Sequence, residues 1–130
     1  MIGKKNIKSF VKQTLGCGCD DKVFELIELQ EDVKVDNRYL LADKINIGNR
    51  LLIYVIALND SSLLKDCLST LFSIGKKERD VSGFNRFRLV IVTEEKNLIT
   101  RIAEPFFNDL VDKDDKMHLH VIAKDEVCFL

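Results

Sequence analysis

The stretch Leu51-Leu52-Ile53-Tyr54-Val55-Ile56-Ala57-Leu58 is the longest apolar run in the chain, and it decides the fold. Eight apolar residues are too few to cross a bilayer. An unbroken run of this length is typical of a parallel strand that is covered on both of its faces. The sequence therefore predicts a central buried strand over residues 51–58.

Upstream of this run the apolar residues repeat every second position, which predicts half-exposed strands. Apolar and charged residues alternate over residues 27–35, and a second strand is expected over residues 39–47. Gly48 and Asn49 tolerate positive φ, so they predict the tight turn of a hairpin. Before the hairpin, residues 6–15 have the apolar spacing of a short helix.

Immediately downstream of the run, apolar residues recur at helical spacing. We expect this helix to begin with a cap at Asp60 or Ser61 and to end at Gly75, because glycine is typical of helix ends. A polar and mostly basic connector, residues 76–86, would then lead to a second buried strand over residues 87–93.

The last third of the chain repeats this order. Residues 98–110 have helical spacing, and Pro105 inside them predicts a kink or a restart of the helix. A final strand is expected over residues 117–123. Two such helical crossovers require the strands that they join to be parallel.

These elements predict an α/β fold. We expect a single three-layer domain over residues 1–130, whose mixed sheet combines an antiparallel hairpin with a parallel β-α-β-α-β half. The composition, 46% hydrophobic and 32% charged, is that of a globular chain. A net charge of −1 provides no general attraction for nucleic acid or an anionic membrane, so we expect neither as a partner. The N-terminus lacks the apolar stretch of a secretory signal, which predicts a cytoplasmic protein with reduced thiols.

Cys17-Gly18-Cys19 is the most distinctive short motif. Two thiols one residue apart can both face a soft metal ion, and a following helix N-terminus lowers the pKa of a thiol. The alternative interpretation is a tight turn between helices, in which small residues simply fit.

His118 and His120 are the only histidines, and they are two residues apart on the predicted last strand. This spacing places both rings on the same face of the sheet, where they can share a metal ion. Joined to Cys17 and Cys19, they would complete a Cys₂His₂ site for zinc, which needs four ligands. The alternative is an edge strand that presents polar groups to water.

The connector and the start of the next strand form a third candidate site. Arg79, Asn85, Arg86 and Arg88 are grouped there with aromatic neighbours, a combination that holds phosphate or stacks on a base. Ligands in open α/β sheets usually lie at the carboxyl ends of strands, whereas this connector precedes a strand. That position favours the alternative of a solvated loop.

Several catalytic signatures are absent from the sequence. A Walker A loop would need glycine where Thr70 stands before Gly75-Lys76. The order of helix, three strands, helix and strand is also that of restriction-endonuclease-like proteins. Their metal-binding carboxylate and lysine are missing around Tyr54 on the third strand, so we reject a nuclease function.

Residues 15–24, Leu-Gly-Cys-Gly-Cys-Asp-Asp-Lys-Val-Phe, together with residues 77–88 and the His118-Leu119-His120 strand, resemble a small prokaryotic family of uncharacterised proteins with an N-terminal Leu-Gly-Cys-x-Cys motif. The resemblance covers most of the chain. It implies no activity, because no activity is known for that family.

Two functional hypotheses follow, and neither decides whether the protein is an enzyme. The first is a small metal- or thiol-dependent protein that uses the Cys-Gly-Cys turn. The second is a non-catalytic protein-interaction or homo-oligomeric assembly module that uses an exposed sheet edge or the basic connector.

Overall fold

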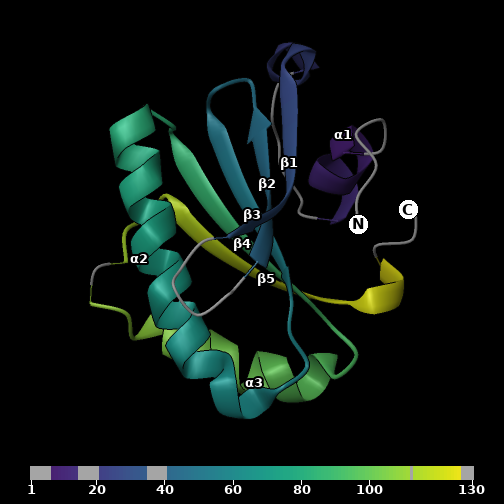
Figure 1. Ribbon diagram of the computed structural model, residues 1–130, viewed down its shortest axis with the longest axis vertical. Coiled ribbons are helices and arrows are strands. Elements are labelled where there is room, and N and C mark those ends of the chain that lie inside the picture. The colour runs from purple at the N-terminus through teal and green to yellow at the C-terminus, as the bar shows by residue number, and fades with distance from the viewer. Residues whose placement is uncertain (1–6, 15–20, 35–40, 112, 127–130) are drawn as a thin grey trace.

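The computed structural model describes residues 7–14, 21–34, 41–111 and 113–126. Within them the chain forms a single α/β domain around a mixed sheet with the strand order β1-β2-β3-β4-β5 (Figure 1). The predicted fold class is confirmed. The strands are β1 (Ile27–Lys34), β2 (Leu41–Ile47), β3 (Leu51–Ala57), β4 (Arg86–Thr93) and β5 (Met117–Ala123).

The pairing of the strands is also as predicted. Strand β2 is antiparallel to both β1 and β3, whereas β4 is parallel to β3 and β5 is parallel to β4. Gly48 and Asn49 adopt positive φ of 60° and 57°, which confirms the predicted turn between β2 and β3. The N–H of Arg50 donates to the carbonyl oxygen of Ile47 at 3.0 Å and closes this turn.

The two long helices are α2 (Leu64–Ser82) and α3 (Lys96–Asn108). A short 3-10 helix, η4 (Ser61–Leu63), precedes α2 and is capped by Asp60, whose carboxylate accepts from the N–H of Ser62 at 2.9 Å. Among the described residues, no helix has both the length and the apolar character needed to cross a membrane. The shorter helical segments are α1 (Ile7–Ser9), η2 (Phe10–Thr14), η3 (Asp21–Glu25) and η5 (Lys124–Glu126).

The sheet lies between two layers of helix. Because β3, β4 and β5 follow one another across the sheet, crossovers of the same hand place α2 and α3 on the same face (Figure 1). The N-terminal segment α1–η2 packs on the opposite face through Ile7, Phe10 and Val11. This arrangement makes three layers.

Strand β3 is buried on both of its faces, as its unbroken apolar run predicts. Leu52, Tyr54 and Ile56 belong to the core beneath α2 and α3. Their neighbours Leu51, Ile53 and Val55 belong to the core beneath the N-terminal layer. All six side chains are at most 5% exposed, so this strand anchors both cores.

The predicted end of the first long helix at Gly75 is wrong. Helix α2 continues to Ser82 and ends at Gly83, which has a left-handed φ of 80° and whose N–H donates to the carbonyl of Arg79. Gly75 instead lies against the ring of Phe87, where a Cβ atom would stand 2.2 Å from Cζ. Gly75 therefore lets the Phe87 ring approach the helix because it has no side chain, and it does not end the helix. Most of the predicted connector, residues 76–82, is helical.

Helix α3 does not restart at Pro105. It is one helix from Lys96 to Asn108 with Pro105 in its last turn. The carbonyl of Pro105 accepts from the N–H of Asp109 at 3.1 Å, so the helical hydrogen bonding continues past the proline.

The contact between Gly75 and Phe87 makes Gly75→Ala a sharp test of the packing. The added methyl overlaps side-chain ring atoms of the fully buried Phe87, which costs about 1–3 kcal/mol, against a gain of up to about 1 kcal/mol in helix propensity. We expect a net loss of roughly 1–2 kcal/mol in the free energy of unfolding, measured with urea. Ser73→Ala, at an exposed position on the same helix, is the control and should be neutral or slightly stabilising.

If overlap with the Phe87 ring causes this loss of stability, Gly75→Ala should lower the free energy of unfolding much less in a Phe87→Leu background. Equal costs in both backgrounds would show that the ring does not limit the space at Gly75.

Candidate functional site

The alternation of side chains along β4 and β5 sorts their residues onto the two faces of the sheet. Phe87 and Leu119 pack beneath α2 and α3. Arg86 and Arg88 flank Phe87, and His118 and His120 flank Leu119, so these four residues project toward the other face. We call Arg86, Arg88, His118 and His120 the Arg/His cluster.

The register of the two strands brings the cluster together. In the parallel ladder Arg88 is the partner of His118, and Val90 is the partner of His120. The arginines and the histidines therefore come from segments about thirty residues apart in the sequence and meet on adjacent strands. The structure thus unites two pairs of residues that the sequence analysis assigned to different sites.

Each arginine of the cluster contacts a histidine ring. Arg86 Nη1 lies 3.3 Å from His118 Nε2, and Arg88 Nη1 lies 2.7 Å from His120 Nε2. A guanidinium group can only donate, so each Nε2 must accept and each ring must keep its proton on Nδ1. In this arrangement both imidazoles are neutral.

The electrostatics of the site agree with neutral rings. Burial, followed by the positive charge of Arg88, lowers the pKa of His120 from 6.5 to about 4. Burial, Arg88 and Arg86 also lower the pKa of His118, partly offset by Asp114 and Asp115. At neutral pH the positive charge of the cluster therefore resides on the two guanidinium groups.

The two arginines also affect one another. Burial, followed by the charge of Arg86, lowers the pKa of Arg88. Arg86 is exposed at the first position of β4, whereas Arg88 and both histidines are half-buried. A ligand would therefore enter past Arg86. The site is a cationic patch that supplies many N–H donors and suits an anion better than a metal ion.

Cys17 and Cys19 lie outside the described residues. The proposed Cys₂His₂ zinc site therefore stays a prediction. Within the described part of the chain, no group of three or more histidine, cysteine, aspartate or glutamate side chains could hold a metal ion. His118 and His120 share a face of the sheet, as predicted, but their Nε2 atoms accept hydrogen bonds from guanidinium groups.

Arg79 does not join the cluster. It lies on α2, is 6% exposed, and forms a bidentate pair with Asp114, with Nη1–Oδ1 and Nη2–Oδ2 distances of 2.9 and 2.6 Å. Its Nε also donates to Asp80 at 3.1 Å. These contacts tie the segment between α3 and β5 to α2, which is a structural role.

Asn85 is exposed just before β4, and its N–H donates to the carbonyl of Arg50 at 2.8 Å. Of the connector residues singled out as binding candidates, only Arg86 and Arg88 belong to the cluster.

A partly buried polar bridge on the helix face was missed by the sequence analysis. The hydroxyl of Tyr54, on β3, donates to Glu78 of α2, and Glu78 pairs with Lys44 of β2 at 2.6 Å. Burial and the adjacent Glu78 raise the pKa of Tyr54, so the phenol stays protonated. Helical spacing continued past Gly75 would have placed Glu78 toward the sheet and predicted this contact.

Breaking the pair between Arg79 and Asp114 should be costly, because a charged partner would remain near the core. We expect Arg79→Ala to lower the free energy of unfolding by about 3 kcal/mol, and Asp114→Asn by about 1–2 kcal/mol because Asp114 is partly exposed. Lys124→Ala is the control: it breaks an exposed pair with Glu94 and should cost less than about 0.5 kcal/mol.

The stabilisation that the Arg79–Asp114 pair provides should depend on pH. The hydrogen bond from Arg79 lowers the pKa of Asp114 below 3.8, so its stabilisation is present above that pH and is lost as the pH falls further. Urea unfolding between pH 5 and 2.5 should show a smaller loss for Asp114→Asn than for the natural chain. Equal losses of stability in the variant and in the natural chain would contradict a lowered pKa of Asp114.

His120 should destabilise the fold on acidification. Its pKa is lower in the folded chain, about 4, than the ordinary 6.5, so between these values the unfolded chain binds more protons. Stability should therefore fall as the pH drops from 6.5 to 4. His120→Gln keeps a neutral acceptor for Arg88 and should reduce this fall by roughly 1–2 kcal/mol in urea unfolding.

His118→Gln provides the comparison, because His118 is the less buried ring of the pair, and we expect a smaller reduction. An unchanged pH dependence in His120→Gln would mean that folding does not lower the pKa of His120.

Comparisons of the chain with protein-family models, with curated proteins and with solved structures find no match. The suggested resemblance of residues 15–24 to a prokaryotic family stays a prediction. Inference about function therefore depends on the geometry and charge of the described residues.

Proposed function

We propose that this protein binds a phosphate-type anion at the Arg/His cluster. One observation carries the proposal: two guanidinium groups project from the same face of β4 and contact neutral imidazole rings, with Arg86 on His118 and Arg88 on His120. This arrangement gathers positive charge at one place on the sheet and surrounds it with further N–H donors.

The spacing of the donors suits an oxyanion. Alternate residues of a strand are roughly 6.6 Å apart along the chain, a distance that two long arginine side chains can close around one tetrahedral anion. Guanidinium groups bind phosphate and carboxylate oxygens through paired N–H donors. Each histidine that accepts at Nε2 also keeps an Nδ1–H, which adds a neutral donor to the site.

A bound anion would also relieve repulsion within the cluster. Burial, followed by the charge of Arg86, lowers the pKa of Arg88, so the two guanidinium groups repel one another. An anion between them would replace this repulsion with two attractive interactions. A divalent metal ion would instead add positive charge and would compete with both arginines for the Nε2 lone pairs.

A metal- or thiol-dependent function of Cys17 and Cys19 is a separate hypothesis, and the anion proposal does not depend on it. Zinc bound at a one-to-one ratio and lost in Cys17→Ser/Cys19→Ser would support that hypothesis. If His118→Gln/His120→Gln also lost the zinc, a metal site would replace the anion site.

Thermal unfolding with inorganic phosphate tests the anion site. If the Kd is about 0.1–1 mM, then 10 mM phosphate stabilises the fold by about 1.4–2.7 kcal/mol, which raises the Tm by several degrees above a sodium chloride control of equal ionic strength. Arg86→Gln should reduce the shift, and Arg86→Gln/Arg88→Gln should abolish it. Arg101→Gln removes an exposed arginine from α3 and should retain the full shift.

Sulfate provides a second arm because its charge is constant between pH 5 and 8. Burial and the two arginines lower the pKa of His118 from 6.5, and protonation of this ring adds a cation to the site. The sulfate-dependent shift should therefore grow as the pH falls, and His118→Gln should remove that growth. An anion effect of equal size in Arg86→Gln/Arg88→Gln and Arg101→Gln would show that phosphate acts elsewhere.

A further inference from the structure

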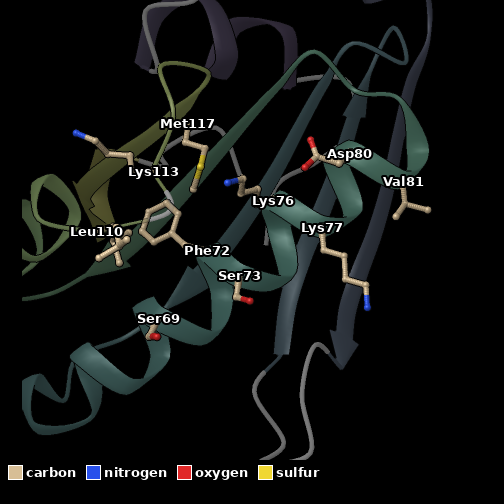
Figure 2. A pocket seen from close by; sticks show the side chains of 11 residues that line it. Ser69, Phe72, Ser73, Lys76, Lys77, Asp80, Val81, Leu110, Lys113 and Met117 are labelled. Atoms are coloured by element: carbon tan, nitrogen blue, oxygen red, sulfur yellow. The ribbon is translucent and has the colours of Figure 1, made fainter.

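A groove of about 580 Å³ lies between α2 and the segment that links α3 to β5 (Figure 2). Phe72 of α2, Leu110 after α3 and Met117 of β5 form its apolar part. Met117 and Phe87 face α2, whereas Arg88 and His118 project to the other face, so the groove and the Arg/His cluster lie on opposite faces of the sheet.

Two valines on the groove are strongly exposed. Val81 is 78% exposed and Val111 is 97% exposed, and they are the most exposed large apolar side chains among the described residues. They come from opposite sides of the groove, since Val81 is on α2 and Val111 follows α3. Apolar area removed from water stabilises a complex by about 25 cal/mol per Å², so both positions favour contact with an apolar surface.

The border of the groove is positively charged. Among the described residues that line it, Lys76, Lys77 and Lys113 are basic and Asp80 is acidic. Asp80 is already paired with Arg79, at 2.9 Å. Lys77 and Lys113 therefore leave more positive than negative charge among the described lining residues, and a negatively charged partner would be complementary to them.

The length of the groove indicates what shape of partner would fit. Its α2 side runs from Ser69 to Val81, and residues 69, 73, 77 and 81 recur every fourth position along one face of the helix. Twelve residues of α-helix rise about 18 Å, which is the length of three to four turns of a second helix. Helices commonly bind in such grooves through apolar residues at spacings of three and four.

We propose that this groove binds a short acidic amphipathic helix of a partner protein. The apolar side of that helix covers Val81, Val111 and the Phe72–Leu110–Met117 surface, and its carboxylates face the lysines. A second copy of this chain is a poorer match, because the apolar faces of the described helices are already buried against the sheet. The groove thus gives the interaction-module hypothesis a definite location.

A designed peptide tests this proposal directly. The probe is a fluorescent 18-residue helix with leucines at positions i, i+3, i+4 and i+7 and glutamates beside them, and its binding is followed by anisotropy. We expect a Kd in the micromolar range for the natural chain. A peptide with the same leucines but with lysines in place of the glutamates should bind at least tenfold more weakly.

Variants separate the apolar and the charged contributions. Val81→Ser/Val111→Ser removes the exposed apolar contacts and should weaken binding of the acidic peptide at least tenfold, and Lys77→Gln should weaken it severalfold. The matched controls are Leu63→Ser and Lys65→Gln, an exposed leucine before α2 and an exposed lysine on α2 that do not line the groove. They should bind as the natural chain does.

Circular dichroism melting of each variant verifies that the fold is retained, which is expected because the altered side chains, Val81, Val111 and Lys77, are exposed. Equal binding of the acidic and basic peptides, or equal binding by groove and control variants, would overturn the proposal. A dimer in light scattering that Val81→Ser/Val111→Ser dissociates would also overturn it, in favour of a second copy. The phosphate-dependent Tm shift should be unchanged in that variant, since the anion site is on the other face.

Discussion

The close contact between the Phe87 ring and the backbone of Gly75 is the constraint on which the rest of the structure depends. It brings α2 close to the sheet and fixes Phe87 on the helix-covered face of β4. Since side chains alternate along a strand, the same contact fixes Arg86 and Arg88 on the opposite face. A shift of β4 by one residue would exchange the two sets and would place both arginines beneath α2.

The same constraint positions the polar contacts of α2. Because the helix continues past Gly75, Glu78 reaches Tyr54, and Arg79 reaches Asp114 in the segment before β5. On this face, the described cations Lys44 and Arg79 are matched with carboxylates. In the Arg/His cluster the guanidinium groups contact neutral rings. The gathering of two guanidinium groups and two imidazole rings on one face of two adjacent strands is the main reason to regard the cluster as a binding site.

The strands and their pairing could be predicted from local patterns, whereas the error at Gly75 could not be avoided locally. The two-sided burial of β3 follows from its unbroken apolar run, and the bounds of β5 follow from its flanking polar residues. Glycine predicts a helix end because it tolerates positive φ, which is the property that Gly83 uses. At Gly75 the chain uses the absence of a side chain, and that need depends on Phe87, twelve residues away, which no local pattern relates to it.

The Arg/His cluster, too, could be predicted only in part from local sequence patterns. Alternation predicts that His118 and His120 share a face, and it applies equally to Arg86 and Arg88. No local pattern contains the register between β4 and β5, because it relates segments that lie about thirty residues apart in the sequence. Once that register places Arg88 opposite His118, pairs that suggest separate metal and loop sites become one cationic surface. The groove and the cluster meet at the start of β5, because Met117, which lines the groove, immediately precedes His118. Alternation along β5 therefore separates the proposed helix-binding groove from the proposed anion site by a single peptide unit, so the two proposed ligands would approach opposite faces of the sheet.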